Sequence, residues 1–216
     1  LGRDVTTRYN RRNKNEYIHI FEYIRKIVDA HKGNYMVFVP SYNMLEKLYD
    51  ITEEEGVGDY HVMTQSPAMT ETEREEFLEE FDRRNDILAF CIMGGIFSEG
   101  IDLTGESLVG AVVVGPGLPQ VCNERQIQMD FFDRNGRDGF RYTYQYPGIN
   151  KVFQAAGRVI RTEKDMGVIA LLDERFAYRE YTELFPIEWN DHLTCNRGNV
   201  RRLLEDFWDK YNSDNS

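Results

Sequence analysis

The sequence predicts a doubly wound α/β domain over residues 1–216, with a mainly parallel sheet and helices on both faces. Apolar runs at 35–39, 87–93, 108–114 and 167–172 show no polar alternation, which is typical of strands buried on both sides. Segments with helical spacing of apolar residues lie between these runs, and strands alternating with helices indicate a parallel sheet. Hydrophobic residues make up 41% and charged residues 29% of the chain, as in globular proteins.

The first half of the chain is expected to form helices and strands in alternation. Their order is helix 17–28, strand 35–39, helix 42–49, strand 60–63 and helix 71–82. Gly33-Asn34 ends the first helix, and Ser41 is a favoured N-cap for the second. At the start of the third, either Thr70 with Glu73 or Thr72 with Glu75 can form a capping box.

The second half continues the alternation. It is expected to contain strands 87–93, 108–114 and 167–172 and helices near 123–132, 151–161 and 199–211. At about 100° per residue, Gln154, Arg158 and Arg161 share a sector of roughly 60° on one helix. Gly157 lies beside them, and a glycine inside a helix costs about 1 kcal/mol relative to alanine, so a ligand is expected to approach closely. Two arginines and a glutamine suit a polyphosphate. The alternative is a surface face of salt bridges.

The charge of the chain is unevenly distributed. Twenty-six basic and 37 acidic residues give a net charge of −11, which argues against a freestanding DNA-binding module. Residues 71–82 carry −6 of this charge, whereas residues 1–34 carry +4. Local charge decides whether a groove can hold phosphates, so the total does not exclude DNA. No run approaches the ~20 apolar residues that span a membrane.

The cysteines and histidines do not indicate a metal site. Three cysteines stand far apart, which fits neither a disulfide framework nor a paired zinc motif, and a reducing compartment is expected. The four histidines form no ligand cluster. The chain begins Leu1-Gly2 without a leader-like segment, and we expect it to be a piece of a longer chain.

Candidate site residues follow the apolar runs, because ligands of such sheets gather beyond the carboxyl ends of the strands. Ser41 begins a helix directly after one strand, where N–H groups can meet an anion. The loop 94–105 has four glycines and two carboxylates, Glu99 and Asp102. It matches neither a Walker A cradle nor a dinucleotide fingerprint. A plain glycine-rich loop and a nuclease metal site at Glu99 and Asp102 are alternatives, although two carboxylates alone make a weak site.

Three segments together resemble the C-terminal motor domain of XPD/DinG-type superfamily 2 DNA helicases. Motif IV of that family is similar to Phe38-Val39-Pro40-Ser41-Tyr42, within 37–43. Motif V is similar to Phe97-Ser98-Glu99-Gly100-Ile101-Asp102, within 94–105. Motif VI, Gln-x-x-Gly-Arg-x-x-Arg, is similar to Gln154-Ala155-Ala156-Gly157-Arg158-Val159-Ile160-Arg161, within 153–161. The order and spacing match from about Thr6 to Tyr211. Residues 162–176 are closer to DinG and Ser98 is closer to XPD, so the subfamily stays open.

The resemblance implies a RecA-like fold and a role for each matching residue. Arg158 and Arg161 would be arginine fingers that reach the γ-phosphate of ATP, and Gln154 would orient them or touch the same nucleotide. The residues implied in ATP binding are Gly100, Asp102, Gly157, Arg158 and Arg161. The residues implied in contacts with single-stranded DNA are Ser41, Tyr42, Gln65, Ser98 and Glu99, with Gln65 the weakest match.

The resemblance also implies partners outside this chain. ATP with Mg²⁺ would be bound mainly by an N-terminal motor domain, which carries the Walker A lysine, the Asp-Glu-Ala-His box and any iron–sulfur cluster. Such helicases move 5′ to 3′ along single-stranded DNA, and we expect a monomer in a prokaryotic cytoplasm, without a membrane. The 216 residues alone are expected to be inactive. The alternative is a non-enzymatic nucleic-acid-binding or protein-docking domain that retains the helicase fold.

Overall fold

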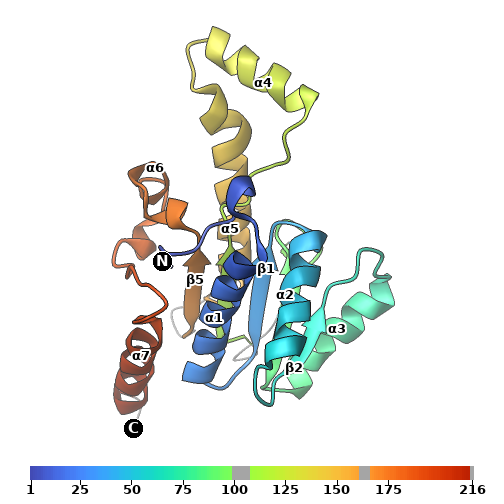
Figure 1. The fold of residues 1–216 in the computed structure, drawn as a ribbon, viewed down its shortest axis with the longest axis vertical. Helices are drawn as coiled ribbons and strands as arrows, with labels where there is room; N and C mark the ends of the chain where they lie inside the picture. The colour runs from blue at the N-terminus through green and yellow to red at the C-terminus, as the bar shows by residue number, and fades with distance from the viewer. Residues whose placement is uncertain (99–107, 161–165, 215–216) are drawn as a thin grey trace.

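A five-stranded parallel sheet organises the chain. The computed structural model describes residues 1–98, 108–160 and 166–214. Within them, the strands are ordered β2-β3-β1-β4-β5 (Figure 1). Their bounds are β1 Tyr35–Val39, β2 His61–Thr64, β3 Ile87–Ile92, β4 Gly110–Val114 and β5 Val168–Leu172. All four pairings are parallel, so the doubly wound parallel sheet is confirmed.

Helices cover both faces of this sheet. One face packs against α1 (Lys14–Ala30), α2 (Tyr42–Glu55) and α7 (Val200–Asp214). The other packs against α3 (Glu71–Arg83), α5 (Tyr146–Ala156) and a segment containing η4 (Glu174–Ala177), α6 (Arg179–Thr182) and η5 (Ile187–Trp189). Every residue of β1 and β4 is buried, which explains their unbroken apolar sequences.

One helix stands apart from the sheet. In Figure 1, α4 (Asn123–Arg134) projects beyond the carboxyl edge of the sheet, and it has no buried residue. A single turn of 3₁₀ helix, η1 (Tyr9–Arg11), precedes α1, and a π-helical turn, η3 (Arg141–Gln145), leads into α5. No helix in the described residues is long and apolar enough to cross a membrane.

The predicted N-caps of α2 and α3 are confirmed. Ser41 caps α2, since its hydroxyl accepts a hydrogen bond from the backbone N–H of Met44 at 3.3 Å. At α3 the capping box uses Thr70 and Glu73 rather than Thr72 and Glu75, with both reciprocal hydrogen bonds present.

The predicted helix 151–161 is wrong at both ends. The helix α5 begins at Tyr146 and ends at Ala156, and Gly157 is its C-cap residue rather than an interior one. The backbone tightens here: Gly157 N–H donates to the carbonyl of Phe153, whereas Arg158 N–H donates to Ala155, one residue closer. Gly157 therefore carries no interior-helix penalty, and Gln154 and Arg158 do not share one regular helical stripe.

Candidate functional site

The carboxyl ends of three adjacent strands bring predicted site residues together. Ser41 and Tyr42 follow β1, Gln65 follows β2, and the turn 93–98 follows β3. Because β2, β3 and β1 are neighbours in the sheet, these segments meet at one edge. The sequence predicts that these residues lie together, although it does not indicate the order of the strands.

Gln65 connects two of these segments. Its side-chain Oε1 accepts a hydrogen bond from the backbone N–H of Ile92 at 2.9 Å, and its Nε2 donates to the Tyr42 hydroxyl at 3.1 Å. Only 4% of Gln65 is exposed. The Tyr42 hydroxyl in turn donates to the carbonyl of Ser66 at 3.4 Å. Gln65 thus ties the ring of Tyr42 to the end of β3.

Ser98 is a buried member of the turn after β3. Its hydroxyl accepts a hydrogen bond from the N–H of Gly94 at 2.9 Å and donates to the carbonyl of Ile92 at 3.2 Å. The residue has no exposed surface. In this conformation the Ser98 hydroxyl fixes the turn, so it does not face a ligand directly.

Arg158 reaches this turn from the end of α5. Its Nη2 donates to the backbone carbonyl of Ser98 at 2.8 Å, across 60 positions of sequence. The side chains of Gln154 and the backbone of Gly157 are exposed beside it, and Arg158 itself is half-buried. A Cβ at Gly157 would lie 3.1 Å from the carbonyl of Phe153 and would meet nothing outside α5 within 4 Å among the described residues. This end of α5 therefore offers an accessible surface beside a positioned guanidinium.

These contacts form one continuous series. Tyr42 bonds to Gln65, Gln65 to the backbone of Ile92, Ile92 to Ser98, and Ser98 to Arg158. The series links residues implied in DNA contact with a residue implied in ATP contact. A displacement at one end has a bonded route to the other end.

A second polar cluster was not predicted from the sequence. Asp173, directly after β5, is fully buried and accepts hydrogen bonds from the Thr7 N–H at 2.7 Å and from Arg175 Nε at 2.7 Å. Burial by itself raises the pKa of Asp173, but the hydrogen bonds and charge of Arg175, with the Thr7 N–H, lower the pKa below its usual value. The cluster fixes the segment before α1 at the carboxyl edge. The only sequence indication was a carboxylate immediately after a buried strand.

Several predicted site residues lie outside the described residues. They are Glu99, Gly100, Asp102 and Arg161, and their predicted roles remain predictions. Within the described ranges, no group of three or more His, Cys, Asp or Glu side chains could hold a metal ion. The metal-dependent alternative at Glu99 and Asp102 stays a prediction, because both residues lie outside the described ranges.

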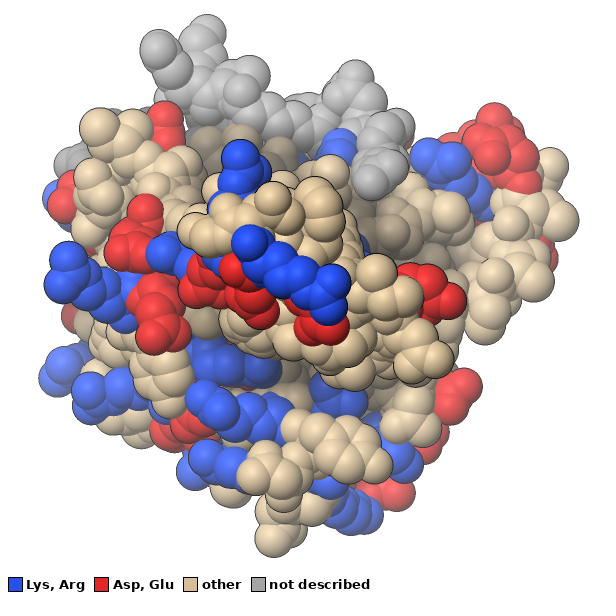
Figure 2. All heavy atoms as spheres, turned by 90° about the horizontal axis from the view of Figure 1, so that it is seen from above, with Lys and Arg blue, Asp and Glu red and all other residues tan. Residues whose placement is uncertain are grey.

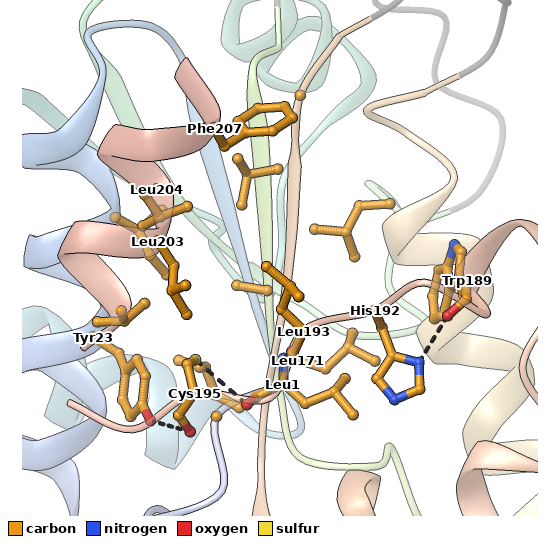
Figure 3. Close-up of a pocket in the computed structure, with 18 of the residues that line it drawn as sticks. Leu1, Tyr23, Leu171, Trp189, His192, Leu193, Cys195, Leu203, Leu204 and Phe207 are labelled. Atoms are coloured by element: carbon orange, nitrogen blue, oxygen red, sulfur yellow. Dashed lines mark hydrogen bonds between the residues drawn. The ribbon is translucent and has the colours of Figure 1, made fainter. Parts of the chain in front are cut away.

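A cavity of about 430 Å³ beside β5 is distinct from this site. Figure 3 shows it between α7, which contributes Leu203, Leu204 and Phe207, and the segment bearing Trp189 and His192. Its lining is largely apolar and includes none of the residues predicted to bind ATP or DNA. The predicted chemistry therefore does not belong to this cavity.

Comparisons with known proteins agree with the motifs. The sequence matches the helicase C-terminal domain family over residues 24–192. A probable ATP-dependent helicase of Methanocaldococcus jannaschii is 30% identical over 165 residues, covering 70% of this chain and 25% of the relative. The ATP-dependent DNA helicase XPD of Sulfolobus acidocaldarius is 25% identical, covering 94% of this chain and 34% of the relative. The 3′-5′ exonuclease DinG of Staphylococcus epidermidis is 25% identical, covering 93% of this chain and 21% of the relative.

The fold has solved counterparts. A structure of an XPD helicase superimposes with a TM-score of 0.74 at 22% identity, covering 90% of this chain and 34% of that chain. The C-terminal domain of the DEAD-box protein Dbp5 gives a TM-score of 0.51 at 15% identity, covering 88% of this chain and 91% of that chain. The RecA-like fold expected from the resemblance is confirmed, and the chain spans about a third or less of the length of the curated relatives named above.

Proposed function

Because the chain belongs to the helicase C-terminal domain family and is of the XPD/DinG type, we propose that it is the C-terminal motor domain of an ATP-dependent DNA helicase. In this role it acts on ATP held mainly by an N-terminal motor domain and on single-stranded DNA. The chain has no Walker A sequence, so catalysis requires both motor domains. The 216 residues alone are expected to leave ATP unhydrolysed.

The hydrogen bond from Arg158 to the Ser98 carbonyl is the observation that supports this proposal most. It holds the guanidinium at the accessible end of α5, beside Gln154 and Gly157. A guanidinium can donate two parallel hydrogen bonds to phosphate oxygens and stabilise charge on a phosphoryl group in transfer. We assign Arg158 and Arg161 to the γ-phosphate and Gln154 to their orientation.

The nucleotide-binding role extends to residues outside the described ranges. Gly100 and Asp102 match motif V and are proposed to contact the nucleotide, with Gly157 allowing its approach. Mg²⁺, which would be bound together with ATP mainly by the N-terminal motor domain, would supply positive charge to the phosphoryl group in transfer. Because Arg158 contacts motif V through Ser98, nucleotide binding at either segment affects the other.

The single-stranded DNA is proposed to lie at the carboxyl edge of the sheet. Ser41 and the ring of Tyr42 are half-exposed there, where a phosphate and a base can reach them. We assign Glu99 to a contact with the same single-stranded DNA. Gln65 and Ser98 are buried, so we propose that they position Tyr42 and the turn 93–98 rather than touch DNA in this conformation.

The test is Arg158→Ala in the natural polypeptide that contains these 216 residues. An arginine finger is worth about 10³-fold or more in turnover, so DNA-stimulated ATP hydrolysis should fall by about that factor. The measurement is steady-state phosphate release with and without oligothymidylate. Arg201→Ala is the matched control, because Arg201 is an exposed arginine on α7 with an i,i+4 partner, Glu205, and should leave turnover unchanged.

A second variant distinguishes a loss of ATP hydrolysis from a loss of folding. Arg158→Lys keeps a donor that can bond to the Ser98 carbonyl. If this variant has the wild-type urea midpoint but a lower rate of ATP hydrolysis, the loss is one of chemistry and not of folding. If Arg158→Ala folds and hydrolyses ATP at the wild-type rate, the proposal is wrong. The non-enzymatic docking domain that retains the helicase fold would then be the better description.

A further inference from the structure

A pocket of about 570 Å³ opens beside the proposed DNA site. One wall is the segment around the start of α1, with Tyr9, Arg12 and Lys14. The other is one side of α2 from Asn43 to Glu54, with Asn43 and Lys47 nearer its start. Asn43 lies two residues after Ser41, so the pocket adjoins the residues already assigned to DNA. Figure 2 looks from above, at the end from which α4 projects, and shows Lys and Arg side chains in the lower half of the view, with Asp and Glu side chains among them.

Two cations of this pocket have no carboxylate partner among the described residues. Arg12 Nε donates to the Thr7 backbone carbonyl at 2.8 Å, and Lys47 forms no ion pair within 4 Å in the described ranges. Their neighbour Lys14 differs, since it pairs with Glu54 at 3.2 Å. Arg12 and Lys47 therefore favour an anion in the space between the two walls.

An exposed aromatic ring lies in the same pocket. Tyr9 is 88% exposed on the 3₁₀ turn η1, and it makes no ring contact with another aromatic in the described part of the chain. Stacking of a base on this ring is favourable because it removes flat apolar surface from water. Cations beside an aromatic platform are the combination that binds single-stranded nucleic acid, with phosphates on the cations and bases on the ring.

The charges along α2 give this pocket a direction. Asn43 and Lys47 occupy the end next to Ser41, whereas the acidic lining residues Asp50 and Glu54 lie one and two turns further on. Phosphate is therefore favoured near Ser41 and repelled at the far end. Successive phosphates of one strand can follow Ser41 and Lys47 and then pass over the segment before α1.

We propose that this pocket is a second subsite for single-stranded DNA, with a phosphate between Arg12 and Lys47 and a base stacked on Tyr9. The subsite rests on the proposed helicase function and extends the DNA path beyond Ser41 and Tyr42. It gives a role to Arg12, one of the basic residues of the positively charged segment 1–34, which the predicted motifs leave unused.

The experiment measures binding of a fluorescein-labelled oligothymidylate of ~12 nucleotides by anisotropy, across a salt series, to the natural polypeptide. Arg12→Ala and Lys47→Ala are each expected to weaken binding about fivefold and to reduce the salt slope by about 0.7, the value for one lost phosphate contact on a single strand. Tyr9→Ala is expected to weaken binding about fivefold or more with an unchanged salt slope, because stacking releases no counterion. Tyr9→Trp should restore affinity.

Controls separate this subsite from bulk charge and from the proposed function. Arg201→Ala removes an equal charge on α7 and should leave affinity unchanged. A duplex of the same length should compete weakly, since its bases are not free to stack. If wild-type protein binds the oligonucleotide but all three pocket variants keep its affinity and salt slope, the subsite is wrong and the helicase function stands. If wild-type protein does not bind single-stranded DNA, both are wrong.

Discussion

Two sets of polar side chains near the carboxyl edge of the sheet behave differently. The anchored set, Gln65, Ser98 and Asp173, is buried, and its polar atoms bond to the protein's own backbone and side chains. The open set, Tyr9, Arg12 and Lys47, lines a pocket. A polar residue near this edge can therefore serve either the fold or a ligand. Its exposure and its bonds, rather than its place in the sequence, separate the two uses.

The largest difference between the sets is expected at Asp173. Asp173→Ala leaves Arg175 and the Thr7 N–H without their buried partner, which should cost about 3–5 kcal/mol of unfolding free energy. Urea unfolding measures this loss. Lys47→Ala, from the open set, should change the unfolding free energy by about 0.5 kcal/mol or less, as for surface positions generally. Equal losses at the two residues would contradict the division.

The same carboxylate predicts a dependence on pH. The pKa of Asp173 is lowered in the folded protein, so its stabilising contribution is present above the unfolded value of about 3.9 and is lost as pH falls through the folded pKa. The stability gap between wild type and Asp173→Asn should therefore narrow below about pH 4. Urea midpoints measured from pH 7 to pH 3 test this, and a gap that widens in acid would contradict it.

Gln65 should show an intermediate effect. Gln65→Leu fills the same space but leaves the partly buried N–H of Ile92 without this partner, which should cost about 1–2 kcal/mol. Release of Tyr42 should also weaken DNA binding. Gln154→Leu is the matched control, because Gln154 is an exposed glutamine and its loss should change stability by about 0.5 kcal/mol or less. Unchanged stability in Gln65→Leu would remove Gln65 from the anchored set.

Ser41 should show a smaller effect on stability than Asp173 or Gln65 and yet affect DNA binding. Ser41→Ala removes an N-cap, worth about 1 kcal/mol, and Thr70→Ala removes the corresponding cap of α3 at similar cost. Only Ser41→Ala should weaken oligothymidylate binding, because Thr70 caps a strongly acidic helix. Equal DNA affinity in the two variants would limit Ser41 to a capping role.

Much of the fold could be predicted because its determinants are local. Unbroken apolar runs such as that of β1 need burial on both faces, and the start of α2 at Ser41 depends on a cap within four residues. The sequence does not predict the end of α5 at Ala156, because the spacing of Gln154–Arg161 fits a continuous helix whereas the backbone tightens at Gly157. Local propensity does not report that change.

The motifs and the element order were determined by the sequence itself, because each depends on neighbouring residues and on periodicity. Only the tertiary structure decided which polar groups are hydrogen-bonded within the protein and which stay open to a ligand. Gln65 meets Ile92 across 27 positions, Arg158 meets Ser98 across 60, and Thr7 meets Asp173 across 166. Such pairings follow from the order of strands in the sheet, which no local pattern encodes. The same packing leaves Arg12 and Lys47 without a carboxylate among the described residues and so makes an open surface for a ligand.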